Sequence, residues 1–168
     1  ERRLLFWGSV PWHYGIVIVL LLPLLGWLIP DWAASWNGLP IRLYLLEVTL
    51  FALALFALFG LVLLILRRWT SPFAAAVTSR MDALLLFLLL VQVVAGLSIA
   101  LFNRWGSWWY LSNAVPYLWS VVTFQPRIDY IQTLPFAVQV HVVNAFLLVA
   151  IFPFSRLVHI FTFPITYL

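Results

Sequence analysis

The chain has 168 residues, of which 65% are hydrophobic and only 8% are charged, and its mean hydropathy is +1.09. A soluble domain carries about 25% charged residues, so the composition excludes a soluble globular domain and predicts an all-α membrane protein. The net charge of +4 comes from arginine alone, too sparse for a nucleic-acid surface, and the absence of cysteine excludes disulfides and thiolate metal sites.

Hydropathy predicts a bundle of four transmembrane helices in one domain covering residues 1–168, without repeats or linkers. A short amphipathic lead precedes the first span, and Pro23 lies inside that span, where it is expected to bend the helix. The connections are expected to be a turn-rich loop, a short polar loop, and a longer segment, 103–134, with one or two short interfacial helices. The predicted spans are 13–29, 41–66, 81–102 and 135–159.

The distribution of arginine predicts the orientation of the chain. Counted from a cytoplasmic N-terminus, six arginines fall on one side of the membrane and three on the other. Because cytoplasmic loops carry the excess of positive charge, the N- and C-termini and the second connection are expected in the cytoplasm. The six are Arg2, Arg3, Arg67, Arg68, Arg80 and Arg156; the three are Arg42, Arg104 and Arg127.

Two of the three histidines are expected at one depth. His13 begins the first predicted span and His159 ends the fourth, both on the cytoplasmic side. Neutral imidazole is a common axial ligand of haem iron, so the pair predicts a haem b held between two helices. A terminal histidine can also be a simple interfacial anchor, which is the better interpretation for either one alone. Gly15 is expected to let a porphyrin approach the first helix.

Three arginines at the same surface are candidates for binding the haem propionates, because guanidinium binds carboxylate in a two-pronged manner. Their presence is equally explained by the positive-inside rule. They are Arg67, Arg68 and Arg156.

The third histidine, His141, is 18 residues before His159, which is five turns of a continuous helix and roughly 27 Å. It is therefore expected on the same helix face but near the periplasmic side, where it could ligate a second, distal haem. The outer half of the first span offers neither histidine nor methionine opposite it, and Met81 lies at the cytoplasmic end of its helix. The residues therefore support one haem b, and a second only weakly.

Glu47 is an ionisable residue about two turns inside the second span. A carboxylate at that depth is costly and is a functional candidate, so a possible quinol site is expected there with Arg42 and Tyr44. A carboxylate that reaches the interface or pairs with an arginine is the alternative. Asp82 begins a span, where capping of its helix is an equal alternative to a functional role.

Several motifs together resemble the gamma subunit of membrane-bound respiratory nitrate reductase. They are SVVTF at 120–124, FPFSRLVHI at 152–160, P-x-x-YL at 164–168, HYG at 13–15 and the 18-residue histidine spacing. That family is a di-haem cytochrome b that oxidises menaquinol or ubiquinol and anchors iron–sulfur and molybdenum subunits. Its members have a further N-terminal span, which this sequence does not show.

The resemblance implies a role for each histidine. His13 and His159 match the pair that holds the proximal haem, and His141 matches a ligand of the distal haem. The partner of the distal ligand falls at Pro23, and proline cannot bind iron. The family's quinol-site lysine is also absent, with Arg42 or Tyr44 near its place.

The expected function is that of a haem b membrane-anchor subunit in a nitrate-reductase-like complex of a bacterial or archaeal cell membrane. It would pass electrons from quinol, or from a periplasmic cytochrome c, to an iron–sulfur subunit at the cytoplasmic face. One alternative is the cytochrome b subunit of a sulfur-cycle or heterodisulfide-type complex. Another is a haem-free structural anchor, which the haem absorbance bands would exclude.

Overall fold

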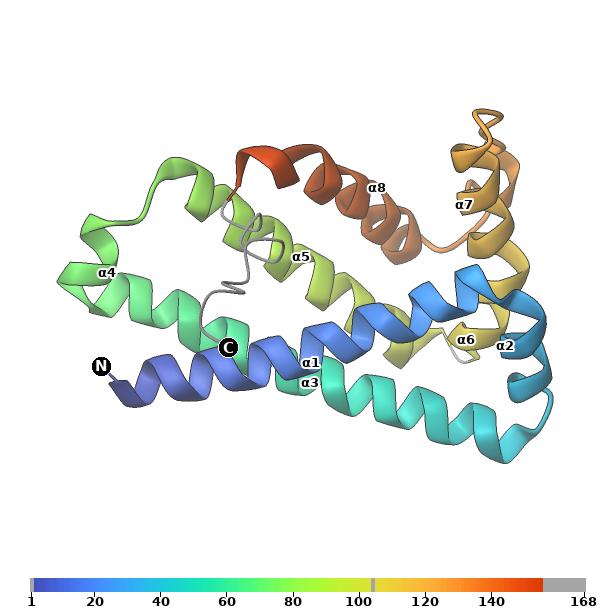
Figure 1. Ribbon diagram of the computed structural model, residues 1–168, viewed down its shortest axis with the longest axis horizontal. Helices are drawn as coiled ribbons and strands as arrows, with labels where there is room; N and C mark the ends of the chain where they lie inside the picture. Colours follow the sequence, from blue (N-terminus) through green and yellow to red (C-terminus); the bar gives the residue numbers. More distant parts are fainter. Residues whose placement is uncertain (1, 104, 156–168) are drawn as a thin grey trace, which may run out of the picture.

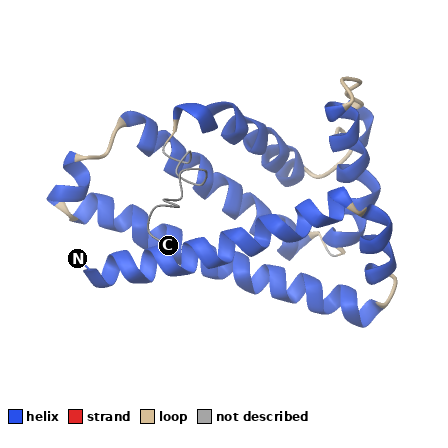
Figure 2. Cartoon of the chain, in the orientation of Figure 1, coloured by secondary structure: helices blue, strands red, loops and turns tan. Residues whose placement is uncertain are grey.

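A computed structural model describes residues 2–103 and 105–155 of the chain. Within these ranges the backbone is helical, joined by short turns and without β-strands (Figure 2). The α-helices are α1 (Arg2–Leu28), α2 (Pro30–Asn37), α3 (Pro40–Thr70), α4 (Pro72–Ala76), α5 (Arg80–Phe102), α6 (Gly106–Trp109), α7 (Val115–Val122) and α8 (Phe136–Ile151). A π-helix (Tyr110–Ala114) joins α6 to α7, and 3-10 turns occupy Ile128–Tyr130 and Phe152–Phe154.

Four of these helices, namely α1, α3, α5 and α8 with its 3-10 extension, are long and apolar enough to cross a membrane. The prediction of an all-α protein with four spans is therefore confirmed. The segment 103–134 contains short helices, as expected. The protein is a multi-pass membrane protein.

The spans form two packed pairs, α1 with α3 and α5 with α8, connected through contacts between α3 and α5 (Figure 1). α1 and α3 run antiparallel along their length, whereas α7 runs across the direction of the spans at the end of the bundle that holds α2 and α6. The core where the pairs meet is formed by apolar side chains of α1, α3 and α5. It consists of Trp12, Ala57, Leu61, Val93 and Leu97.

Glycines bring α1 and α3 into close contact. A Cβ added at Gly60 would lie 2.5 Å from the Trp12 nitrogen and 2.6 Å from the Gly8 oxygen. One added at Gly15 would lie 2.7 Å from the Leu53 oxygen. Small residues at such contacts allow membrane helices to pack backbone against backbone. Gly15 therefore serves the α1–α3 interface, and the expectation that it opens α1 to a porphyrin is wrong.

The first span is longer than expected, because α1 begins at Arg2 and includes the segment interpreted as an amphipathic lead. Its two internal prolines, Pro11 and Pro23, do not end it. His13 is consequently the twelfth residue of α1 rather than its first. The predicted turn-rich loop is also partly helical, since Pro30 is well suited to the first position of α2.

The fourth span ends earlier than expected. α8 ends at Ile151, a 3-10 turn follows, and Ser155 has extended backbone angles, φ −108° and ψ 165°. Pro153 supplies the reason, because a proline has no N–H for the helical hydrogen bond and its ring clashes with the preceding turn. One continuous helix from His141 to His159 is therefore wrong, and the five-turn spacing no longer places both imidazoles on one face.

Phe124 is expected to destabilise the turn after α7. Its φ of 58° is left-handed, and the bonds Phe124 N to Val121 O (3.0 Å) and Gln125 N to Ser120 O (2.8 Å) form the helix ending in which glycine is usual. The side chain is 92% exposed. Phe124→Gly should stabilise the protein by about 1 kcal/mol and raise Tm in detergent by about 2–4 °C. Phe124→Ala, which keeps a Cβ, is the control, and an unchanged Tm in Phe124→Gly would contradict the prediction.

Candidate functional site

His13 projects from the exposed side of α1 with one ring nitrogen held by the preceding turn. Its Nδ1 lies 2.7 Å from the Ser9 carbonyl oxygen and 3.2 Å from the Ser9 hydroxyl. A carbonyl only accepts, so the proton of the neutral imidazole is on Nδ1 and the lone pair is on Nε2. This is the arrangement in which a second partner fixes the tautomer of a metal-binding histidine.

His159 and Arg156 lie outside the described residues. The pairing of His159 with His13 and the binding of a haem propionate by Arg156 therefore stay predictions. Met81 lies in the first turn of α5, at the end of the bundle that holds Arg68, as expected.

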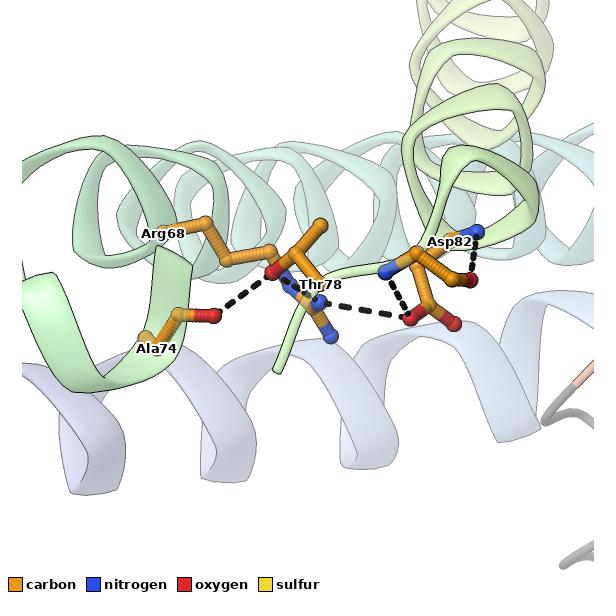
Figure 3. Close-up of polar contacts among 5 residues, drawn as sticks. Arg68, Ala74, Thr78 and Asp82 are labelled. Atoms are coloured by element: carbon orange, nitrogen blue, oxygen red, sulfur yellow. Dashed lines mark hydrogen bonds and ion pairs between the residues drawn. The ribbon is translucent and has the colours of Figure 1, made fainter. Parts of the chain in front are cut away.

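Arg68 connects the end of α3 to the start of α5 (Figure 3). Its Nη1 donates to the Thr78 hydroxyl at 2.9 Å and lies 4.0 Å from the Asp82 carboxylate. Asp82 and Ser79 cap α5 reciprocally: Ser79 N donates to Asp82 Oδ2 (2.9 Å), and Asp82 N donates to Ser79 Oγ (3.1 Å). The capping alternative for Asp82 is confirmed. Arg68 thus has partners within the protein, and a role toward a propionate stays a prediction, as it does for Arg67.

His141 lies between α8 and α5 and contacts Gln92 with both ring nitrogens. Its Nδ1 donates to the Gln92 carbonyl oxygen (3.1 Å), and its Nε2 accepts from the Gln92 side-chain amide (3.1 Å). The Gln92 Oε1 accepts from Asn144 Nδ2 at 2.6 Å, and the same Nδ2 donates to the Leu88 carbonyl at 2.9 Å. We call His141, Gln92 and Asn144 the His141 cluster.

In the described part of the chain, each of the three residues of the predicted quinol site contacts a different partner. Glu47 Oε1 accepts from the backbone N of Ser107 in α6 (3.1 Å). The Arg42 guanidinium lies over the Trp36 ring, 5.1 Å from its centroid, and the exposed Tyr44 packs against Trp105. Glu47 therefore joins α6 to α3 through a hydrogen bond that accounts for its position, and the quinol role of the three stays a prediction.

Sequence reasoning missed the partners of two histidines. Ser9 is four residues before His13, and this spacing puts a carbonyl in reach of a helical side chain. Gln92 and Asn144 are polar residues within apolar spans, a signal that each requires a hydrogen-bond partner. That signal does not say which partner, because Gln92 and His141 are 49 residues apart.

Tyr110 covers Pro23 from the segment between α6 and α7. Its hydroxyl donates to the Pro23 carbonyl oxygen (2.9 Å), and burial raises the pKa of Tyr110 to about 12. The folded protein therefore holds this proton more tightly than the unfolded chain, whose tyrosine titrates near 10. The contribution to stability is complete below about pH 10 and is lost as the pH rises toward 12.

We expect the thermal stability of the detergent-solubilised protein to fall between pH 10 and 12, and Tyr110→Phe to remove part of that fall. Tyr110→Phe should also cost about 1 kcal/mol at neutral pH, through the lost hydrogen bond. The measurement is Tm against pH for both proteins. Tyr14→Phe, at an exposed tyrosine of α1, is the control, and parallel curves for wild type and Tyr110→Phe would contradict the assignment.

The fold defines a polytopic helical membrane protein with a histidine on its first span and another on its fourth. The chain belongs to the nitrate reductase gamma subunit family, whose model matches residues 1–168. It is 28% identical to the nitrate reductase gamma chain of Bacillus subtilis and 32% identical to the respiratory nitrate reductase 1 gamma chain of Escherichia coli K12. Each alignment covers all of this chain, with 77% of the first relative and 76% of the second.

A further relative has a different length. The chain is 33% identical to the nitrate reductase-like protein NarX of Mycobacterium tuberculosis H37Rv, and it spans only 26% of that protein. The expected family resemblance is thus confirmed over the whole chain.

Proposed function

We propose that the chain is a haem b membrane-anchor subunit of a nitrate-reductase-like complex that passes electrons from quinol to an iron–sulfur subunit. The proposal rests on the family match over residues 1–168 and on the hydrogen bond from His13 Nδ1 to the Ser9 carbonyl. The family match also favours a nitrate reductase over the sulfur-cycle alternative. The iron–sulfur and molybdenum subunits are the proposed partners.

His13 and His159 are the proposed ligands of this haem. When bound, haem b would supply a one-electron redox centre held by these two histidines. The Ser9 carbonyl holds the proton of His13 on Nδ1 and so leaves the lone pair on Nε2, the atom that would bind iron. Arg67, on the last turn of α3, and Arg156 are the proposed partners of the propionates.

The arginine distribution supports an orientation with the α4 end in the cytoplasm. The start of α1, the end of α3 and the start of α5 share this end of the bundle (Figure 1). In the described ranges it carries Arg2, Arg3, Arg67, Arg68 and Arg80, whereas Arg42 and Arg127 lie at the other. We place the partner subunits at the α4 end.

The electron donor is proposed to be a quinol, with a periplasmic cytochrome c as the alternative. Oxidation of one quinol to quinone releases two electrons and two protons, and the electrons leave singly. At the outer end of α3, Tyr44 is 60% exposed and Arg42 is also exposed, so both can meet a molecule arriving from the lipid. The nearby Glu47 carboxylate is the proposed first proton acceptor.

The test is optical and uses the purified complex. Menaquinol should produce the spectrum of reduced haem b, with a sharp α band and a shifted Soret band, and subsequent nitrate should restore the spectrum of the oxidised haem. If a soluble cytochrome c reduces the haem and menaquinol does not, the donor is a cytochrome c and not a quinol. Absence of any haem b band in the intact complex would overturn the proposal in favour of a haem-free anchor.

A further inference from the structure

The His141 cluster is a hydrogen-bond network that joins α5 to α8. Both ring nitrogens of His141 have partners, and so do both polar atoms of the Gln92 amide. Asn144, which is only 4% exposed, donates to Gln92 and to the Leu88 carbonyl. Inside a membrane such satisfied contacts join helices, and a polar group left without its partner is costly.

The ring of His141 is directed toward α5. A Cβ added at Gly96 would lie 3.2 Å from His141 Cε1, so the imidazole packs directly over this glycine. α1, which carries Pro23, forms its main contacts with α3 instead. In this conformation Nε2 points at the Gln92 amide and not at a metal site between α8 and α1.

Two aromatic side chains of the 106–122 segment contact one face of the second half of α1. Tyr110 bonds to the Pro23 carbonyl, and a Cβ at Gly26 would lie 3.5 Å from Tyr110 Cε1. Trp119 packs on Trp27 with ring centroids 5.2 Å apart and donates to the Trp27 carbonyl (3.3 Å). Tyr110 and Trp119 therefore occupy one side of α1 beside Pro23 and Trp27.

The donor set does not fit a second haem. Two bis-histidine haems need four imidazoles, whereas the chain has three histidines and no cysteine. Its one methionine, Met81, lies in the first turn of α5, at the opposite end of the bundle from Pro23. At the place where the family resemblance implies a ligand, this chain has a proline.

We infer that this chain holds one haem b, and that His141 acts as a hydrogen-bonded link between α5 and α8 instead of binding iron. The inference rests on the proposed function for its first haem and departs from the two-haem pattern that the resemblance implies. In place of a distal haem, the outer half of the bundle is held together by the His141 cluster and by the aromatic contacts of Tyr110 and Trp119.

The first test is the ratio of haem b to chain in the intact complex, measured by pyridine haemochrome after any c-type haem is removed. The inference requires a ratio near one. A ratio near two would overturn it while leaving the proposed function in place. A ratio of zero would overturn the proposed function itself, so the two failures are distinguishable.

The second test uses variants of the cluster. His141→Leu should keep the haem b content and spectrum but lower Tm by about 2–8 °C, because the Gln92 amide loses its partner. The double variant His141→Leu/Gln92→Leu should lower Tm by less than the sum of the two single changes, as partners in one network do. Loss of haem b from His141→Leu would overturn the inference. If a variant does not fold, the ratio of haem b to chain in the wild-type complex still tests the inference.

Discussion

Replacing His13 with alanine should abolish the α and Soret bands of haem b. The Ser9 carbonyl holds the proton of His13 on Nδ1 and so leaves the lone pair on Nε2, and in the proposed function no other described histidine is available to substitute. Quinol-driven electron transfer to nitrate should fall at least ~100-fold, since loss of a partner of a metal ligand alone costs 10–100-fold. The measurement is the dithionite-reduced spectrum of the purified complex.

Tyr14→Phe is the matched control, because Tyr14 is the next residue along α1 and is also exposed. It should keep the full spectrum. Nitrate reduction driven by a soluble dye that reduces the catalytic subunits directly should remain in the membrane fraction of His13→Ala, which would show that these subunits are still anchored. Full retention of haem b in His13→Ala would exclude His13 as a ligand.

The second large effect is expected at Gly60, where α1 and α3 are closest. A methyl group there would meet the Trp12 backbone nitrogen at 2.5 Å and the Gly8 oxygen at 2.6 Å, and neither is the end of a flexible side chain. The helices must therefore separate, which disturbs the core around Leu61. We expect Gly60→Ala to cost about 1–3 kcal/mol, visible as a Tm several degrees lower in detergent.

Gly26→Ala is the control for this change. It is also a helical glycine in a span, but its added Cβ would lie 3.5 Å from the nearest atom, which is an ordinary contact. Since alanine is the better helix former, Gly26→Ala should be neutral or stabilising. Equal Tm values for the two variants would refute close α1–α3 packing as the reason for the glycines.

The combination of one haem and a hydrogen-bonded His141 has a consequence for electron entry. His13, the proposed haem ligand, is next to Trp12, which contacts Gly60 of α3, whereas Tyr44 and Glu47 lie near the start of α3. A donor at the outer surface would therefore be farther from this haem than from a distal one. The comparison of menaquinol with a cytochrome c as donor is for this reason the most informative kinetic experiment.

Much of this architecture was predictable from local patterns. Runs of apolar residues predict spans whatever their neighbours, because a helix satisfies its own backbone in lipid. Capping of α5 by Asp82 was also predictable, since Ser79 precedes it by the three residues that reciprocal capping requires. Pro153 is also a visible signal for the early end of α8. Our prediction of a continuous helix gave more weight to the 18-residue spacing of the histidines.

The family motifs and the types of candidate ligand are likewise properties of the sequence. Three histidines, no cysteine and a proline at position 23 limit the number of bis-histidine haems that the chain can hold. Such a limit is compositional and does not depend on how the helices pack.

Only the tertiary structure decided which polar residues meet. Gln92 and His141 are 49 residues apart, and Glu47 and Ser107 are 60 apart. Their contacts depend on how each helix is rotated and how far it slides along its neighbour, and hydropathy carries little of that information because lipid is as apolar as the side chains it surrounds. The sequence by itself determined the spans and the supply of ligands, whereas helix packing turned His141 toward Gln92 and Glu47 toward α6.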